Sequence, residues 1–163
     1  MKKFGLVVSA VTLAIGLTAC SGNNEEKTEK DSKVSKAEVK KAMVHFYMDL
    51  GKKINQTDVD LNAYEGAEKP DPKIKPQASE SAAAVSEELK KIEIPAELKD
   101  QKASIEEALT DLANSYQAKA DELKKDKPNL DAANETFAQG EGKLGKVFED
   151  IGMGKTSIGV EVN

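Results

Sequence analysis

The stretch from Pro95 to Lys125 decides the fold: PAELKDQKASIEEALTDLANSYQAKADELKK. Its apolar residues follow one another at intervals of three, four or seven positions, and they are Leu98, Ile105, Leu109, Leu112, Tyr116, Ala120 and Leu123. This spacing places them on one face of a helix and is close to a heptad repeat. Proline is tolerated in the first turn of a helix, and Glu97 suits the positive end of the dipole. The pattern predicts one long helix from Pro95 to about Lys125, at the centre of the packing.

Two more apolar stripes lie on either side of this segment. The stretch from Ala78 to Ile92 predicts a helix that buries Ala82, Val85, Leu89 and Ile92. After a turn at Asp126–Asn129, another stripe predicts a helix that ends at Gly152, and its members are Leu130, Ala133, Phe137, Gly140, Leu144, Val147, Phe148 and Ile151. Both stripes have helical spacing, so each helix has one face to bury.

The first helix of the domain is marked by a capping box. In Ser35-Lys36-Ala37-Glu38 the serine side chain accepts from the backbone of the third helical residue, and the glutamate reaches back to the serine. An apolar face follows and ends near Asn55-Gln56; it consists of Val39, Met43, Phe46, Tyr47, Leu50 and Ile54. A helix that begins at Ser35 is therefore expected.

Four amphipathic segments can bury their apolar faces together, so the sequence predicts an all-α protein. We expect an antiparallel bundle of about four helices over residues 35–152. Thr57–Gln77 contains three prolines and is expected to be a long loop. In the tail, residues 153–163, apolar residues alternate at Ile158, Val160 and Val162, but no partner strand is evident, and the tail is expected to be irregular.

The N-terminal residues point to export. Lys2 and Lys3 precede an apolar, uncharged run from Phe4 to Ala19, which is shorter than the ~20 residues that a membrane-spanning helix needs. The run closes with Leu17-Thr18-Ala19-Cys20, and Cys20 is the only cysteine. This ending resembles the lipobox of bacterial lipoprotein signal peptides. The alternative is an ordinary signal peptide that is cut elsewhere and leaves a free thiol.

The lipoprotein resemblance implies a division of the N-terminal region. Residues 1–19 would be removed as a signal peptide, and Cys20 would become the lipidated N-terminus. Residues 20–34 would then be the lipidated cysteine and a flexible tether, because Ser21–Lys33 contains no apolar side chain to bury. The expected location is the extracytoplasmic face of the cell membrane, and the absence of arginine hints at a Gram-positive source.

Composition and motifs exclude several functions. The net charge is −5 and every basic residue except the one histidine is lysine, which argues against nucleic acid as a partner. Gly140–Gly145 matches the dinucleotide pattern G-x-G-x-x-G, but a helical stripe precedes it where that motif needs a strand. We therefore interpret Gly140 as a point of close helix approach. Gly154-Lys155-Thr156 lacks the upstream glycine of a P-loop, which would stand at Glu149.

Candidate chemistry is sparse. His45 and Met48 stand three residues apart on the first helix and could offer imidazole and thioether to copper or haem, but no second ligand set accompanies them. No bound metal or cofactor is therefore expected. A second histidine for a catalytic triad is missing, and no carboxyl stands in an apolar run that would raise its pKa. The sequence predicts that the protein is not an enzyme.

The remaining interpretation is a non-catalytic binding or scaffolding protein at the cell envelope, held to the membrane by its lipid. Leu61, Tyr64 and Ile74 are apolar residues in the expected loop, and they are the candidates for contact with an envelope protein. The same side chains could instead cap the end of the bundle. The alternative function is a small-ligand or metal/haem carrier that uses the first helix and the loop of residues 57–77.

Overall fold

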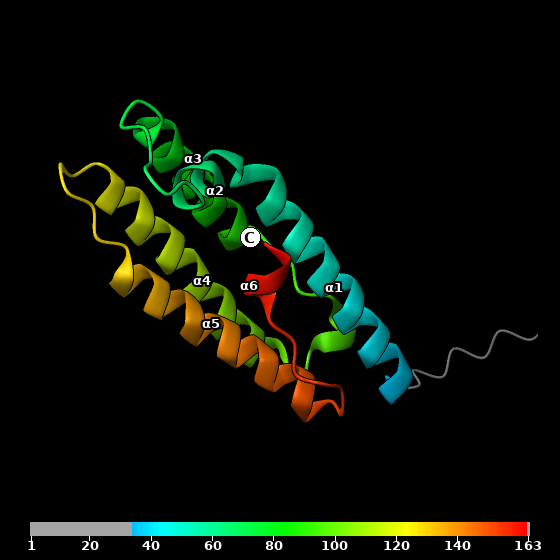
Figure 1. Ribbon diagram of the computed structural model, residues 1–163. Coiled ribbons are helices and arrows are strands. Elements are labelled where there is room, and N and C mark those ends of the chain that lie inside the picture. The colour runs from blue at the N-terminus through cyan, green and yellow to red at the C-terminus, as the bar shows by residue number, and fades with distance from the viewer. Residues whose placement is uncertain (1–33, 163) are drawn as a thin grey trace, which may run out of the picture. The chain divides into compact units, whose positions relative to one another are not determined.

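The computed structural model describes residues 34–162, and within this range the chain forms helices and no strand. The elements are α1 (Lys36–Thr57), α2 (Val59–Glu65), α3 (Lys75–Lys90), the 3₁₀ helix η1 (Ala96–Leu98), α4 (Lys102–Leu123), α5 (Asp131–Asp150) and α6 (Ile158–Glu161). The four long helices α1, α3, α4 and α5 alternate in direction (Figure 1). The predicted all-α bundle is thus confirmed. The signal peptide, Cys20 and the tether up to residue 33 lie outside the described residues.

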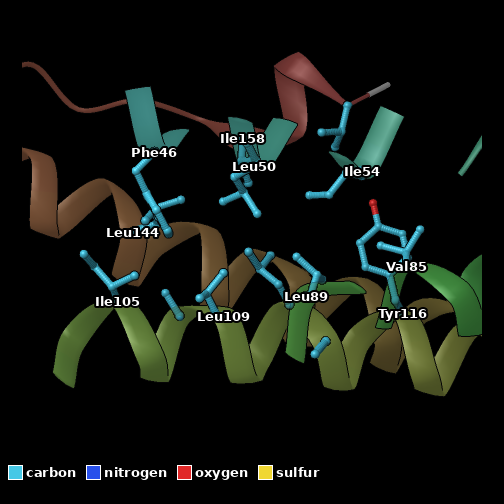
Figure 2. Packing of buried hydrophobic residues seen from close by; sticks show 14 of the residues in the cluster. Phe46, Leu50, Ile54, Val85, Leu89, Ile105, Leu109, Tyr116, Leu144 and Ile158 are labelled. Atoms are coloured by element: carbon cyan, nitrogen blue, oxygen red, sulfur yellow. The ribbon is translucent and has the colours of Figure 1, made fainter. Parts of the chain in front are cut away.

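Helix α4 lies at the centre of the bundle, as its long apolar stripe predicted. It packs extensively against both α3 and α5, whereas α1 packs on α3, beside η1 (Figure 1). Figure 2 shows Ile105, Leu109 and Tyr116 along α4, with Leu50 of α1 above them. The buried face of α4 therefore joins the other helices into one hydrophobic core.

The start of α1 has the predicted capping box. The Ser35 hydroxyl accepts from the backbone N–H of Glu38 at 3.2 Å, and the Glu38 carboxylate accepts from the backbone N–H of Ser35 at 2.8 Å. The two bonds satisfy backbone donors that the helix itself leaves unpaired.

The close approach of α4 and α5 depends on Gly140. A Cβ atom at this position would lie 2.9 Å from the carbonyl oxygen of Ala108 and 3.0 Å from Cγ of Leu112. These distances leave no room for any side chain. Gly142, two residues later on the same helix, faces open space. The interpretation of Gly140 as a packing residue is confirmed, and the glycine pattern lies within α5 with no strand before it.

The prediction of a loop over Thr57–Gln77 is wrong for much of that segment. Residues Val59–Glu65 form α2, and α3 begins at Lys75, so only Asp58 and residues 66–74 lie outside the helices. Residues 58–65 contain neither proline nor glycine, and Leu61 is buried against the core, which stabilises a short helix. Pro76 lies in the first turn of α3, where a missing N–H costs nothing.

The predicted helix from Pro95 to Lys125 is interrupted near its start. A 3₁₀ turn covers Ala96–Leu98, and α4 begins only at Lys102. The backbone N–H groups of Leu98 and Gln101 bond to residues three positions earlier, which is a tighter winding than that of an α-helix. Leu98 is nevertheless fully buried, as its place in the stripe predicted.

The prediction of an irregular tail holds for residues 153–157 and is wrong for Ile158–Glu161, which form α6. Ile158 and Val162 are buried, whereas Val160 is exposed. Residues four positions apart lie on the same side of a helical turn, which explains why Ile158 and Val162 are both buried. The alternation of apolar residues in the tail is therefore not the sign of a strand. Residues 153–162 are called the strap below.

Candidate binding groove

Two hollows adjoin the linker between α3 and η1, and they share Ile92 and Glu93 in their walls. The larger one, of about 650 Å³, lies between the end of α3, the linker and α4. The smaller one, of about 370 Å³, lies between the linker and α1. We call the two together the linker groove.

The floor of the larger hollow is aliphatic. It contains Leu89, Leu109 and Ala113, which belong to the buried core, and Ile92 and Ile94, which are half-buried and border the hollow. Residues Ile92 and Ile94 pack against the core from the linker. Helix α3 ends at Lys90, and the linker that follows it runs without regular structure to Pro95, the residue before η1. An apolar surface is thus open to solvent at this point.

The rim of the larger hollow carries both signs of charge. Lys102 pairs with Glu106 at 3.6 Å, and Lys90 pairs with Glu87 at 2.8 Å, with all four side chains about half exposed. Asn114 is exposed on α4 and lines the same hollow. Exposed pairs of this kind contribute little to stability, so their side chains can turn toward a ligand at low cost. An aliphatic floor with a polar rim is typical of a recognition surface.

The smaller hollow brings in a predicted site residue. His45, Asp49 and Lys53 are spaced four residues apart along α1, and they line the hollow with Phe46 and Leu50 beneath them. His45 is exposed. The first helix therefore contributes titratable groups to the linker groove, and Lys91 and Glu93 of the linker line the same hollow.

The other predicted site residues lie elsewhere. Met48 is 64% exposed and does not line the linker groove, so His45 and Met48 are not brought together there. Leu61 is buried in the core and offers no surface, whereas Tyr64 and Ile74 are half-buried. Lipidation of Cys20 lies outside the described residues and stays a prediction. Within residues 34–162, no group of three or more His, Cys, Asp or Glu side chains is placed to hold a metal ion.

A buried polar cluster under the start of α2 was not foreseen. The Asp58 side chain is fully buried, with one oxygen 3.4 Å from the Tyr116 hydroxyl and the other without a hydrogen-bond partner. Burial raises the pKa of Asp58, and it also raises the pKa of Tyr116. No carboxyl stands in an apolar run of the sequence, so the raised pKa of Asp58 was not predicted. Residues far apart in the sequence create this environment, which is why the local pattern gave no sign of it.

A partly buried ion pair lies beside this cluster. Lys119 of α4 pairs with Glu65 of α2 at 2.9 Å, and the two side chains are 10% and 24% exposed. The Lys119 ammonium also lies 5.7 Å from the centre of the Tyr116 ring and 6.0 Å from that of Phe137. These contacts join α2, α4 and α5, and we interpret the cluster as structural.

Comparisons with known proteins give no relative: neither the family models, nor the curated proteins, nor the solved structures contain a significant match to this chain. Among the helices of residues 34–162, none combines the length and the apolar character that a bilayer crossing requires.

Proposed function

We propose that the chain is a lipid-anchored protein of the extracytoplasmic membrane face that works by binding a partner protein through the linker groove. The anchor rests on the resemblance of Leu17–Cys20 to a lipobox. The binding role rests on one observation above all, the open hollow of about 650 Å³ with an aliphatic floor.

The partner we propose is a peptide segment of an envelope protein that carries aliphatic side chains. Its aliphatic groups would cover Ile92 and Ile94, and its backbone amides would find the Asn114 side chain at the rim. The rim carries Lys90 and Lys102 as well as Glu93 and Glu106, so it suits a segment of mixed charge better than a strongly acidic or basic one.

Cross-linking and pull-down from intact cells tests the proposal. Asn114→Arg places a long charged side chain over the larger hollow, and it should reduce the captured partner at least tenfold. Asn134→Arg is the matched control, because Asn134 is also an exposed asparagine, on α5, and lies outside the linker groove. Both variants should melt within a few degrees of the wild type, since exposed substitutions of this kind change stability little.

Tyr64→Ser separates this surface from the one predicted around residues 59–74. If Tyr64→Ser abolishes capture of the partner and Asn114→Arg does not, the docking surface lies at α2 and the following turn instead of the linker groove. A wild-type protein that captures no partner would contradict the binding role. A visible absorbance band or bound metal in protein purified from its own host would support the carrier alternative.

A further inference from the structure

The linker between α3 and η1 has the pattern of a single β-strand without a neighbour. Its sequence from Lys91 is KIEIP, in which charged and apolar residues alternate. Burial alternates in the same way, because Ile92 and Ile94 are half-buried against the core while Lys91 and Glu93 are exposed. A period of two residues is that of an extended chain. Pro95 has φ −54° and ψ 144°, which continues the extended course.

The backbone groups of this short stretch are unpaired. Within residues 34–162, the N–H groups of Glu93 and Ile94 donate no hydrogen bond, and the carbonyls of residues 92–94 accept none. Pairing is found on either side: the N–H of Ile92 donates to the carbonyl of Leu89 at 3.3 Å, and the carbonyl of Pro95 accepts from η1 at 2.9 Å. An extended chain with free donors and acceptors is a template on which a second strand can add.

The charges around the linker select one kind of residue in the added strand. Lys90 and Lys102, which line the larger hollow, each pair with a glutamate on their own helix, and Lys91 pairs with a glutamate of α3. Glu93 is exposed and has no ion pair within the described residues. Because opposite charges directly across two strands stabilise their pairing, a lysine or arginine is favoured opposite Glu93.

We propose that the partner of the linker groove binds as an extended segment that adds a strand along residues 92–94, with the side-chain pattern aliphatic, basic, aliphatic. Its backbone pairs with the free groups of the linker. Its aliphatic side chains cover the floor beside Ile92 and Ile94, and its basic side chain lies beside Glu93. Pro95 has no N–H and ends the template. The inference rests on the proposed function, since it specifies how the same groove recognises its partner.

Synthetic peptides test the mode of binding. The probe is a short fluorescent peptide with Val-Lys-Val at its centre, and its affinity for the full chain in lipid nanodiscs is measured by fluorescence anisotropy. In one control peptide the amides of both valines are N-methylated, and in the other only the amide of the lysine is. Consecutive residues of a strand present their N–H groups at opposite edges, so one of the two controls should bind at least tenfold more weakly than the probe.

A charge reversal tests the contact with Glu93. Glu93→Lys should weaken binding of the Val-Lys-Val peptide at least fivefold and strengthen binding of the matching Val-Glu-Val peptide. Glu97→Lys is the control, because Glu97 is an exposed glutamate of η1 outside the linker groove, and it should change neither affinity. Both variants should melt within a few degrees of the wild type, since both positions are exposed.

Amide hydrogen exchange gives the direct readout. With the probe bound, the amide of Glu93 or that of Ile94 should exchange at least tenfold more slowly. Failure of the alternating peptide to bind, or binding that protects neither amide, overturns strand addition. A peptide with valines at helical spacing that binds instead, and that Asn114→Arg displaces, also overturns it while the groove remains a binding site. The capture experiment with Asn114→Arg therefore tests the proposed function separately.

Discussion

A few single residues occupy positions where the packing tolerates only one kind of side chain. Gly140 is the clearest case, because backbone and side-chain atoms of α4 lie within 3.0 Å of where its Cβ would be. Gly140→Leu should therefore lower the free energy of unfolding by about 1–3 kcal/mol or more through overpacking. Chemical denaturation measures this change.

The matched control is Gly142→Ala on the same helix. Nothing lies within 4 Å of a Cβ atom at Gly142, so alanine should be neutral or raise stability by up to about 1 kcal/mol through helix propensity. Equal effects of the two substitutions would contradict the assigned packing of α4 against α5.

A second residue-scale prediction concerns pH. Burial raises the pKa of Asp58 in the folded protein, so the folded state favours the protonated side chain. The resulting contribution to the free energy of unfolding is complete at pH values below the ordinary pKa of aspartate. It is lost as the pH rises through the raised pKa. Asp58→Asn removes the charge that must be buried. In thermal melting from pH 4 to pH 8, the melting temperature of the variant relative to that of the wild type should increase as the pH rises. At neutral pH the variant should be at least as stable as the wild type.

The charged and titratable groups near Asp58 determine which result would contradict this prediction. Tyr116 and Lys119 of α4 and Glu65 of α2 face this part of the core. If Asp58 were ionised and held by Lys119, Asp58→Asn would lose stability relative to the wild type with increasing pH. The exposed carboxyls of Glu38 and Asp121 have lowered pKa values and act equally in both proteins, so the difference between them isolates Asp58.

At the scale of elements, the strap is a structural part of the bundle. Ile158 is 1% exposed in the core, whereas Val160 on the same turn is 76% exposed. Ile158→Ala should cost about 2–5 kcal/mol of unfolding free energy, as is usual for a buried isoleucine. Val160→Ala should change it by less than about 0.5 kcal/mol. Similar melting temperatures for both variants would mean that the strap is not docked.

The long helices could be predicted from the sequence because each has one apolar face and recognisable ends. The capping box at Ser35 and the stripe through Leu109 are local signals, and both were confirmed. The short helices could not be predicted in this way. Tertiary contacts stabilise α2 and α6, through Leu61 in one case and Ile158 in the other, and a turn or two of helix has too few residues to show a period.

The linker groove could not be predicted from the sequence either; of the predicted site residues, only His45 lines it. Its walls come from α1, α3, α4 and the linker, and only the packing of these elements brings Ile94 and Asn114 to one hollow. The prediction for Leu61 shows the same limit: an apolar residue in an apparent loop suggested a docking surface, and the fold uses it as core.

At the scale of the whole molecule, we predict that Cys20 is the mature N-terminus and carries lipid. Two acyl chains anchor a protein stably, whereas one gives only marginal binding. Mass spectrometry of the N-terminal peptide from native membranes should show acylated Cys20, and Cys20→Ala should stay unprocessed or be released. An unmodified thiol on protein in the culture medium would exclude the anchor.

Photo-cross-linking in intact cells shows whether the anchored bundle binds a partner through the linker groove. A photoreactive amino acid replaces Asn114 in one variant and Asn134 in the other. We expect a cross-linked envelope protein from position 114 and none from position 134. Equal cross-linking from both positions, or none from position 114, would contradict binding through this groove.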